Sequence, residues 1–295
     1  MFTQLFGGKS LGNLLGSLNQ IVVKIKVAVI VSLFYLFHGI MRLLPKRTLV
    51  RLKANLSPIV QLDYRRHRIL LHADSPLGLY RARACQKEPE TVRWIEEFVR
   101  PGDVFYDIGA NVGAYSLIAS KYCGGDLIVH AFEPSFSTYY QLSQNIILNQ
   151  CEHSITPHMI CLTEKPQLVT FNYYSLEGGS ALHTLNEVTV DAFGNQFEPA
   201  LRQDLLGFSL DYLVSTFGFP IPNHIKLDVD GSERDILQGA SDTLNCNAVK
   251  SILIEVGTLN RESDVVTEFL IGKGFQIVSK TDRGDGATWN CVFRR

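Results

Sequence analysis

The sequence predicts an α/β protein built on a doubly wound, mostly parallel sheet, and three observations support this. Short apolar runs alternate with helical patterns, and two strand–helix units fit within residues 104–150, which requires crossover connections between parallel strands. The chain has 295 residues, 46% hydrophobic and 19% charged, enough for one large domain with an N-terminal addition. The last two apolar runs, joined by TDRGDG, have the spacing of an antiparallel hairpin.

Local signals assign most elements in order. A helix at 89–99 begins with Pro89 and acidic residues and stops before Pro101–Gly102. Strands are expected at 103–109, 126–134, 167–175, 224–231, 249–256, 275–280 and 287–295, and further helices at 112–123, 136–150, 232–240 and 261–274. Residues 186–208 form a strand-and-loop excursion whose shape the pattern does not define.

The charge distribution sets the N-terminus apart. Residues 1–62 hold eight Lys or Arg and no Asp or Glu, whereas the rest of the chain holds 20 basic and 29 acidic residues, a net of −9. A basic end on an acidic body favours contact with an anionic surface, and a membrane is the first candidate. The body lacks the basic, aromatic-rich strand of RNA-binding domains, so no nucleic-acid partner is expected.

The apolar residues 21–44 are the candidate membrane contact. Within them, Val27–Leu44 is 18 residues long and only His38 and Arg42 are able to carry charge, which is the lower limit for a membrane span. The basic residues that follow would then place the body in the cytoplasm.

Two alternatives stay open for this helix. It can lie on the membrane surface, because a narrow polar stripe runs along an otherwise apolar cylinder. The stripe consists of Lys24, Tyr35, His38, Arg42 and Lys46. It can also belong to a soluble cytoplasmic protein or to a transit sequence. The expected organisation is a membrane-associating segment over 1–54 and a main domain over 55–295, whose N-terminal extension reaches about residue 100.

The strand at 103–109 ends in a glycine turn, DIGANVG, of the kind found in nucleotide sites. A dinucleotide fingerprint would need glycine at two positions where this chain has Asn111 and Ala114. Asp107 would also repel a pyrophosphate near the helix N-terminus. The alternative function, an NAD-dependent oxidoreductase of Rossmann type, is therefore disfavoured.

S-adenosyl-L-methionine fits this turn better because it carries no phosphate. Its ammonium can meet Asp107 directly or through water, and Gly109 and Gly113 let the chain turn tightly beside it. The next strand ends at Glu133, 24 residues after Gly109, where a carboxylate can accept both ribose hydroxyls. Each residue alone is ordinary loop chemistry, but the combination indicates a nucleoside site.

Four segments carry a longer pattern: GDVFYDIGANVGAYSLIAS, AFEPSFSTYYQLSQNIILN, SLDYL and IKLDVDGSERDILQGA. With these segments, the chain resembles the FkbM family of S-adenosylmethionine-dependent methyltransferases over roughly residues 90–280. It implies a Rossmann-like class I methyltransferase fold with seven strands and an antiparallel last strand, and O-methylation of a sugar or polyketide hydroxyl. The implied cofactor contacts are Asp107, Gly109, Asn111 and Gly113 at the methionine part and Glu133 at the ribose.

Three features depart from the family's pattern. The usual D-V-E-G motif is Asp228–Gly231 in this chain, with an aspartate at position 230 that is one methylene shorter. The reach of that acid toward a substrate or metal is therefore changed. The stretch Val190–Phe208 is longer than the family's connection, and the basic apolar N-terminus lies outside the pattern.

Methyl transfer to an alcohol needs a group that orients the hydroxyl about 3 Å from the methyl carbon and takes up its proton. The acids after the strand at 224–231 stand where such a group belongs in an open α/β sheet. Asp228 is the first candidate for general base or hydroxyl acceptor and Asp230 the second, both expected on one strand face. His183 and His224 are alternative bases, although a lone histidine is more often structural.

A Mg²⁺ ion bound by these acids is a weaker alternative, because oxygen ligands suit it but Glu233 is expected to favour a helix N-terminus instead. The sequence thus predicts an enzyme, a membrane-associated O-methyltransferase acting at the cytoplasmic face. Its acceptor is expected to be a hydroxyl of a sugar, a glycan or a lipid-linked molecule. A non-catalytic scaffold that keeps the cofactor-binding fold is the remaining alternative.

Overall fold

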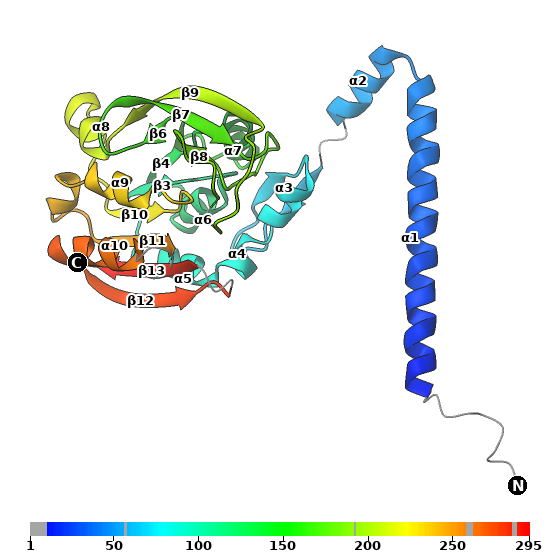
Figure 1. The fold of residues 1–295 in the computed structure, drawn as a ribbon. Helices are drawn as coiled ribbons and strands as arrows, with labels where there is room; N and C mark the ends of the chain where they lie inside the picture. The colour runs from blue at the N-terminus through cyan, green and yellow to red at the C-terminus, as the bar shows by residue number, and fades with distance from the viewer. Residues whose placement is uncertain (1–10, 56–57, 192, 258–261, 285–287) are drawn as a thin grey trace, which may run out of the picture. The chain divides into compact units, whose positions relative to one another are not determined.

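The computed structural model describes residues 11–55, 58–191, 193–257, 262–284 and 288–295. The chain forms two units, Met1–Ser57 and Pro58–Arg295. The first unit contains two helices, α1 (Leu11–Leu43) and α2 (Lys46–Asn55). The second unit holds every strand of the described chain and all of the remaining helices (Figure 1).

Helix α1 begins earlier than the sequence pattern predicts, at Leu11. Its segment Lys26–Leu43 has a mean hydropathy of 1.6 and no residue buried against the protein, so within the described part of the chain one helix is long and apolar enough to cross a membrane. α1 ends at Leu43, ahead of Pro45, and Lys46 starts a separate helix. The predicted polar stripe therefore does not reach Lys46, because it assumed one continuous helix.

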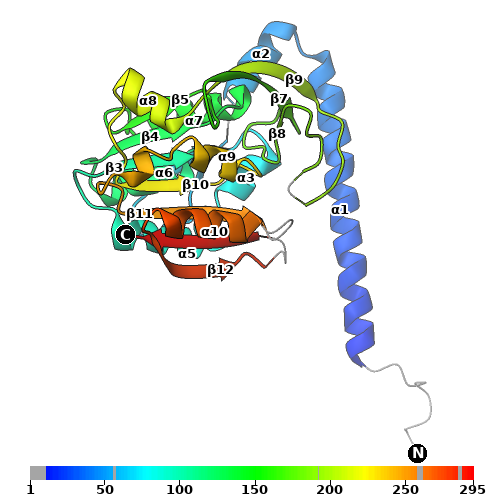
Figure 2. The same cartoon turned by 60° about the vertical axis from the view of Figure 1, so that its left-hand side comes forward.

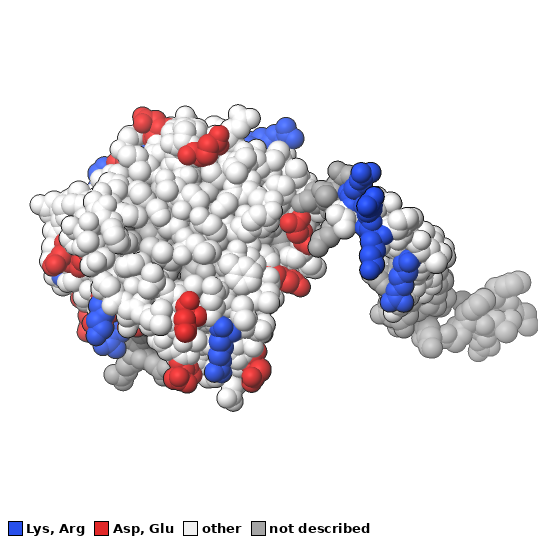
Figure 3. All heavy atoms as spheres, turned by 90° about the horizontal axis from the view of Figure 1, so that it is seen from above, with Lys and Arg blue, Asp and Glu red and all other residues white. Residues whose placement is uncertain are grey.

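Helix α2 is basic. It carries the exposed side chains of Lys46, Arg47 and Arg51, and no acidic residue. Figure 3 shows blue Lys and Arg side chains gathered over this helix. A short cationic helix directly after an apolar one has the composition of a segment that contacts anionic headgroups.

The second unit is built on a seven-stranded sheet with the order β12-β13-β11-β10-β3-β4-β5. The strands are β3 (Val104–Ile108), β4 (Ile128–Phe132), β5 (Ile155–His158), β10 (His224–Leu227), β11 (Ser251–Gly257), β12 (Gln276–Asp282) and β13 (Thr288–Arg294). Neighbours from β11 through β5 are parallel, whereas β13 runs antiparallel to both β11 and β12. The predicted doubly wound sheet with an antiparallel last strand is confirmed.

Helices cover both faces of this sheet (Figures 1 and 2). One face carries α5 (Pro89–Phe98), α6 (Ala114–Tyr122) and α7 (Phe136–Leu148), and the other α8 (Leu210–Phe217), α9 (Glu233–Gln238) and α10 (Glu262–Gly272). Successive residues of β3 alternate between the two cores: Phe105 packs in the first and Tyr106 in the second. The chain runs outward from β3 to β5 and returns at β10, so the strand order reverses between β3 and β10.

A second, four-stranded sheet with the order β6-β9-β7-β8 lies beside the main one. Its strands are β6 (Cys161–Leu162), β7 (Gln167–Tyr173), β8 (Thr184–Leu185) and β9 (Leu201–Phe208). This sheet gives the 186–208 excursion its shape. Ahead of α5, the N-terminal extension forms β1 (Ile59–Gln61), β2 (Leu70–His72), α3 (Pro76–Arg81) and α4 (Ala84–Lys87), and a 3-10 turn lies at Thr243–Asn245.

Candidate active site

A cavity of about 460 Å³ opens at the carboxyl ends of β3, β4 and β10, where the strand order reverses. Open α/β sheets bind ligands at this position. Each strand contributes the residues that follow it, and the wall opposite comes from the loop between β7 and β8. Its polar lining includes Asn111 after β3, Glu133 after β4, Asp228 and Asp230 after β10, and Arg81 of α3.

The turn after β3 requires glycine for two reasons. Gly109 has a φ of 76°, and a Cβ placed on it would lie 1.8 Å from the carbonyl oxygen of Asp228. Gly113, with a φ of 86°, precedes α6, and its Cβ would lie 2.5 Å from Leu142 Cδ1. Glycine therefore lets the turn after β3 touch the loop after β10, which brings the two halves of the cavity together.

Glu133 faces this turn with both carboxylate oxygens. Its Oε2 accepts the backbone N–H of Asn111 at 3.0 Å, and its Oε1 accepts that of Ser135 at 2.9 Å. Burial raises the pKa of Glu133 to about 7, although these two donors favour the charged form. Each oxygen keeps a further lone pair for a hydroxyl donor on the cavity side.

Asp107 is fully buried and, among the residues that the structure describes, does not line the cavity. Its Oδ2 accepts the Ser116 hydroxyl of α6 at 2.6 Å, and its Oδ1 lies 3.6 Å from Nζ of Lys226. Burial raises the pKa of Asp107, against the opposing effects of Lys226 and Ser116. The carboxylate that the sequence assigns to the cofactor's ammonium is thus paired with a lysine, and its contact with the cofactor stays a prediction.

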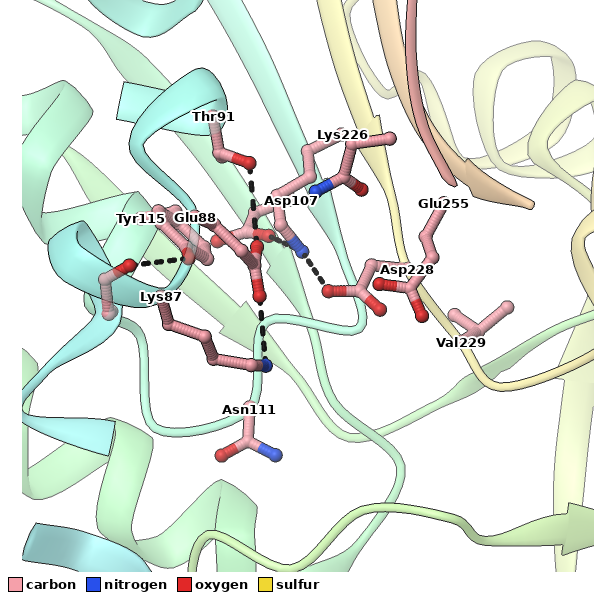
Figure 4. Close-up of polar contacts among 12 residues, drawn as sticks. Lys87, Glu88, Thr91, Asp107, Asn111, Tyr115, Lys226, Asp228, Val229 and Glu255 are labelled. Atoms are coloured by element: carbon pink, nitrogen blue, oxygen red, sulfur yellow. Dashed lines mark hydrogen bonds and ion pairs between the residues drawn. The ribbon is translucent and has the colours of Figure 1, made fainter. Parts of the chain in front are cut away.

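Lys226 connects the two acidic groups of the site (Figure 4). Its side chain is 1% exposed, and its Nζ lies 3.0 Å from Oδ2 of Asp228 and 5.3 Å from the ring centre of Tyr115. Burial works against the charged amine, but Asp228 and Asp107 outweigh it and raise the pKa of Lys226. The amine therefore stays protonated between two carboxylates.

Asp228 lies just past the end of β10 and reaches the cavity with a quarter of its side chain exposed. Burial alone would favour its neutral form. The charges of Lys226, Arg283 and Lys87 outweigh that effect and hold the pKa of Asp228 well below its usual range. The cavity therefore contains a carboxylate that stays ionised throughout the physiological pH range.

Asp230 differs from the sequence expectation in its geometry. β10 ends at Leu227, and Asp230 has a left-handed backbone with a φ of 58°, so Asp228 and Asp230 do not share a strand face. Oδ2 of Asp230 accepts the backbone N–H of Leu182 at 2.7 Å. Burial, followed by the charge of Asp228, raises the pKa of Asp230.

Glu233 shapes the same loop. Its Oε1 accepts the N–H of Val229 at 3.2 Å and its Oε2 that of Gly231 at 2.9 Å. As the first residue of α9, Glu233 does stand at a helix N-terminus, as expected. Its carboxylate is used to hold the loop after β10 in place.

Neither histidine that the sequence offers as a base is suited to that role. Nδ1 of His183 accepts the N–H of Tyr174 at 3.0 Å, so the proton of the neutral ring sits on Nε2. His224 begins β10, at the end remote from Asp228, and its ring bonds Ser251 and Asp103. Burial lowers the pKa of both His183 and His224 to about 4.

A second ionic group was not apparent from the sequence. Oε1 of the buried Glu88 lies 2.9 Å from Nζ of Lys87 and 2.9 Å from a terminal guanidinium nitrogen of Arg283, which also pairs with Glu255. The group joins α4, β11 and the end of β12, which lie far apart in the sequence, so no local motif reveals it. It braces the cavity wall on the side of Asp228.

Magnesium finds no support in the arrangement of these acids. Within the described ranges, no group of three or more His, Cys, Asp or Glu side chains is placed to hold a metal ion. The carboxylates near the cavity are instead occupied by Lys226, Arg283 and backbone N–H groups.

The residues present fit S-adenosylmethionine. The cavity combines an apolar wall that includes Phe132, Ile160 and Leu162, suited to an adenine ring, with the Glu133 carboxylate, suited to a ribose. An adjoining space of about 40 Å³ is lined by the turn at Gly109–Val112 and by Arg81, whose positive charge suits the carboxylate of the methionine part. The two spaces together therefore offer groups complementary to the adenine, the ribose and the amino-acid part of the ligand.

Comparison with known proteins agrees with the geometry. The Methyltransferase FkbM domain family matches residues 107–277. The hexuronic acid methyltransferase AglP of Haloferax volcanii is 24% identical over 180 residues, 60% of this chain and 66% of that protein. The 31-O-demethyl-FK506 methyltransferase FkbM of Streptomyces tacrolimicus is 25% identical over 207 residues, 62% of this chain and 76% of that protein.

Among solved structures, the precorrin-6y C5,15-methyltransferase of Geobacter metallireducens superposes with a TM-score of 0.42 and 13% identity, over 70% of this chain and 87% of that chain. The family match covers the whole span from Asp107 in β3 to the start of β12, including every strand end that lines the cavity. It favours the methyltransferase prediction over an NAD-dependent oxidoreductase. The chain belongs to the FkbM family of S-adenosylmethionine-dependent methyltransferases.

Proposed function

We propose that this enzyme methylates a hydroxyl of a sugar, a glycan or a lipid-linked acceptor at the cytoplasmic face of a membrane. The observation that carries the proposal is the position of Asp228, which lies 3.0 Å from Nζ of Lys226 and faces the same cavity as Glu133. When bound, S-adenosylmethionine supplies an electrophilic methyl group on a sulfonium. What the protein adds is the placement of an acceptor oxygen in line with that group.

The residues divide into two halves. Gly109, Asn111 and Gly113 shape the wall for the methionine part, and Glu133 accepts the ribose hydroxyls. Asp107 helps to hold Lys226 in its charged form, and Lys226 in turn pairs with Asp228. The positions of Asn111 in the turn after β3 and of Glu133 after β4, both at the cavity, support this division.

Asp228 serves the acceptor. Its carboxylate accepts a hydrogen bond from the acceptor hydroxyl, which orients the oxygen. It also stabilises the positive charge that develops on this oxygen as the C–O bond forms and the S–CH3 bond breaks, leaving a neutral thioether. Because its pKa is low, Asp228 is a weak base and does not retain the proton. The proton leaves the ether oxygen and passes to water. Lys226 keeps the carboxylate fixed at 3.0 Å.

The nature of the acceptor is supported by two lines. The relatives' names refer to a hexuronic acid and to an O-demethylated macrolide precursor, both of which offer hydroxyls. The cavity lining in this chain also combines Tyr80 with Arg81 and Lys87. An aromatic ring next to cations suits a polyhydroxylated or acidic sugar.

Membrane association is supported by the first unit. The apolar segment Lys26–Leu43 is followed by the basic α2. If Lys26–Leu43 spans a bilayer, the basic residues after it favour a cytoplasmic position for the second unit.

Methyl transfer tests the proposal directly. The full chain, purified in detergent, is incubated with methyl-tritiated S-adenosylmethionine and a panel of uronic acid glycosides, neutral glycosides, lipid-linked sugars and amines. We expect label on hydroxylated acceptors, and a loss of about 100-fold or more in Asp228→Asn. Asp235→Asn, an exposed carboxylate of α9, is the matched control. Label on amines alone, or full turnover in Asp228→Asn, would contradict the proposal.

A further inference from the structure

The segment Gly178–Leu182, called the strap, lies between β7 and β8 and borders the cavity at its Ser180–Leu182 end. Four side chains from three separate parts of the second unit bond its backbone: Ser75 and Arg81 of α3 and its N-terminus, Asn111 after β3, and Asp230 after β10. These bonds join Ser75 Oγ to Gly178 O at 3.3 Å, Arg81 Nε to Gly179 O at 2.9 Å, Asn111 Nδ2 to Ser180 O at 2.8 Å, and Leu182 N to Asp230 Oδ2 at 2.7 Å. So many side-chain bonds to five consecutive residues mark a segment whose position is specified, although it belongs to no strand or helix.

The bonds at Ser180 and Leu182 involve three residues with a left-handed backbone. Asn111, Leu182 and Asp230 have φ angles of 49°, 63° and 58°. The left-handed region costs a leucine about 1 kcal/mol or more, and such residues persist where the surroundings fix them. Asn and Asp tolerate it better because their side chains bond nearby backbone, as Asn111 does when its Oδ1 accepts the N–H of Val112.

The strap touches both halves of the cavity. Ser180, Ala181 and Leu182 line it directly. At one end, Asn111 bonds the strap with its side chain and Glu133 with its backbone N–H. At the other end, Asp230 belongs to the loop after β10 that carries Asp228.

We propose that the strap couples the two binding sites, and that Asn111 and Asp230 are positioning residues that hold it. The proposal rests on the division of the cavity into a cofactor half and an acceptor half. A ligand that fixes Glu133 and the turn after β3 fixes Asn111, and through it Ser180. The wall of the acceptor half is then in place when the cofactor is bound, and by linkage a fixed strap favours cofactor binding. Asp230 acts through Leu182, in contrast to Asp228, which faces the acceptor.

The backbone geometry allows matched variants. Asp230→Asn keeps an oxygen for the Leu182 N–H and tolerates the left-handed conformation, whereas Asp230→Gly loses the oxygen without adding strain. Asn111→Gly likewise removes the bond to Ser180 at no steric cost. If the charge of Asp230 matters, both Asp230→Asn and Asp230→Gly will be defective. If only its hydrogen bond to Leu182 matters, Asp230→Gly alone will be defective.

Hydrogen exchange of the full chain, with and without saturating S-adenosylhomocysteine, tests this directly. In the wild type we expect the ligand to slow exchange of the amides of 180–182, Leu182 above all. In the unliganded Asp230→Gly and Asn111→Gly variants we expect these amides to exchange about tenfold faster, with Asp230→Asn close to wild type. Unchanged protection in β3 and β11 shows that the domain remains folded.

Three outcomes would overturn the proposal: no effect of bound ligand on the wild-type strap, wild-type protection of Leu182 in Asp230→Gly, or equal defects in Asp230→Asn and Asp230→Gly. The first outcome is tested on the wild-type protein alone, by comparing exchange with and without ligand. Calorimetry on the same samples separates this result from the proposed function. Absence of S-adenosylhomocysteine binding at millimolar concentration contradicts the cofactor assignment, whereas binding without any change in the strap contradicts only the coupling.

Discussion

Gly109 has no side chain, and the structure leaves no room for one. We expect Gly109→Ala to abolish S-adenosylhomocysteine binding, because its Cβ would meet the Asp228 carbonyl at 1.8 Å and force the two halves of the cavity apart. Gly102→Ala is the matched control, since Gly102 has a φ of 82° but nothing within 4 Å of the added carbon. Both variants bear a left-handed alanine, which costs about 1–2 kcal/mol. Calorimetry and thermal unfolding check the difference, and equal binding by the two variants would contradict it.

Glu133 should make the affinity for S-adenosylhomocysteine depend on pH. Its carboxylate has a pKa of about 7, and only the ionised form accepts two ribose hydroxyls. Protonation below pH 7 therefore competes with binding, and the affinity for S-adenosylhomocysteine should fall about tenfold between pH 8 and pH 6. Titration calorimetry at the two pH values measures this. Glu133→Gln should show a flat profile, and a wild type as flat as the variant would show that Glu133 does not contact the ligand.

At the scale of elements, β10 has different roles at its two ends. Asp228 follows its carboxyl end, whereas His224 begins it and is held by Ser251 at 2.7 Å and Asp103 at 3.1 Å. Trp94 of α5 donates to the same Ser251 hydroxyl at 3.0 Å. Although Asp103, His224 and Ser251 form a chain of hydrogen bonds like that of a hydrolase triad, Ser251 is fully buried, so the network anchors α5 to the sheet.

This network predicts how stability responds to acid. Burial lowers the pKa of His224 to about 4, whereas an unfolded histidine has a pKa of about 6.5. Between these values the unfolded chain binds the proton, so the free energy of unfolding falls as pH drops from 7 to 5, by about 1–2 kcal/mol for this group. Denaturant unfolding followed by tryptophan fluorescence checks it. His224→Gln should be less stable at pH 7 but lose less between pH 7 and 5; an undiminished loss would contradict the assignment.

The elements also show what the sequence reveals and what it hides. Short apolar runs that alternate with helical patterns predicted β3, β4, β10 and β11. The spacing around TDRGDG predicted the antiparallel pair β12–β13. The four-stranded second sheet was not predicted beyond β7, because β6 pairs with β9 and β9 with β7 across long stretches of chain. Short strands with distant partners leave little periodicity in the local sequence.

The residues of the candidate site also differ in how far the sequence could predict them. The positions of Gly109 and Gly113 in the turn after β3 and of Glu133 after β4 were predictable, because they depend on backbone geometry and on strand ends. The role of Lys226 could not be predicted, since nothing local shows that a lysine inside a strand is buried between two carboxylates. The strap bonds to Asp230 and Asn111 depend on a loop from the second sheet, so sequence spacing could not reveal them.

For the whole molecule, we expect the first unit to attach the protein to a membrane and the second unit to carry out catalysis. We expect the full chain to stay with membranes after alkaline carbonate extraction, because the exposed apolar residues of Lys26–Leu43 gain a hydrophobic environment. Charged substitutions Val29→Glu and Leu33→Glu, both at exposed positions of α1, should release it. A matched pair at exposed Leu168 and Leu206 of the second sheet should not. Release of the wild-type chain by carbonate would contradict a spanning helix.

At the scale of the whole molecule, we propose that one cavity holds a cofactor half at Glu133 and an acceptor half at Asp228. Calorimetric titration with S-adenosylhomocysteine of full-length Glu133→Gln and Asp228→Asn tests this division most directly. We expect at least tenfold weaker binding in Glu133→Gln, the loss that follows when hydrogen bonds to a charged group are removed. In Asp228→Asn we expect binding within about threefold of wild type, because removing a group that serves only the acceptor costs the cofactor little affinity. Loss of binding in Asp228→Asn together with normal binding in Glu133→Gln would contradict it.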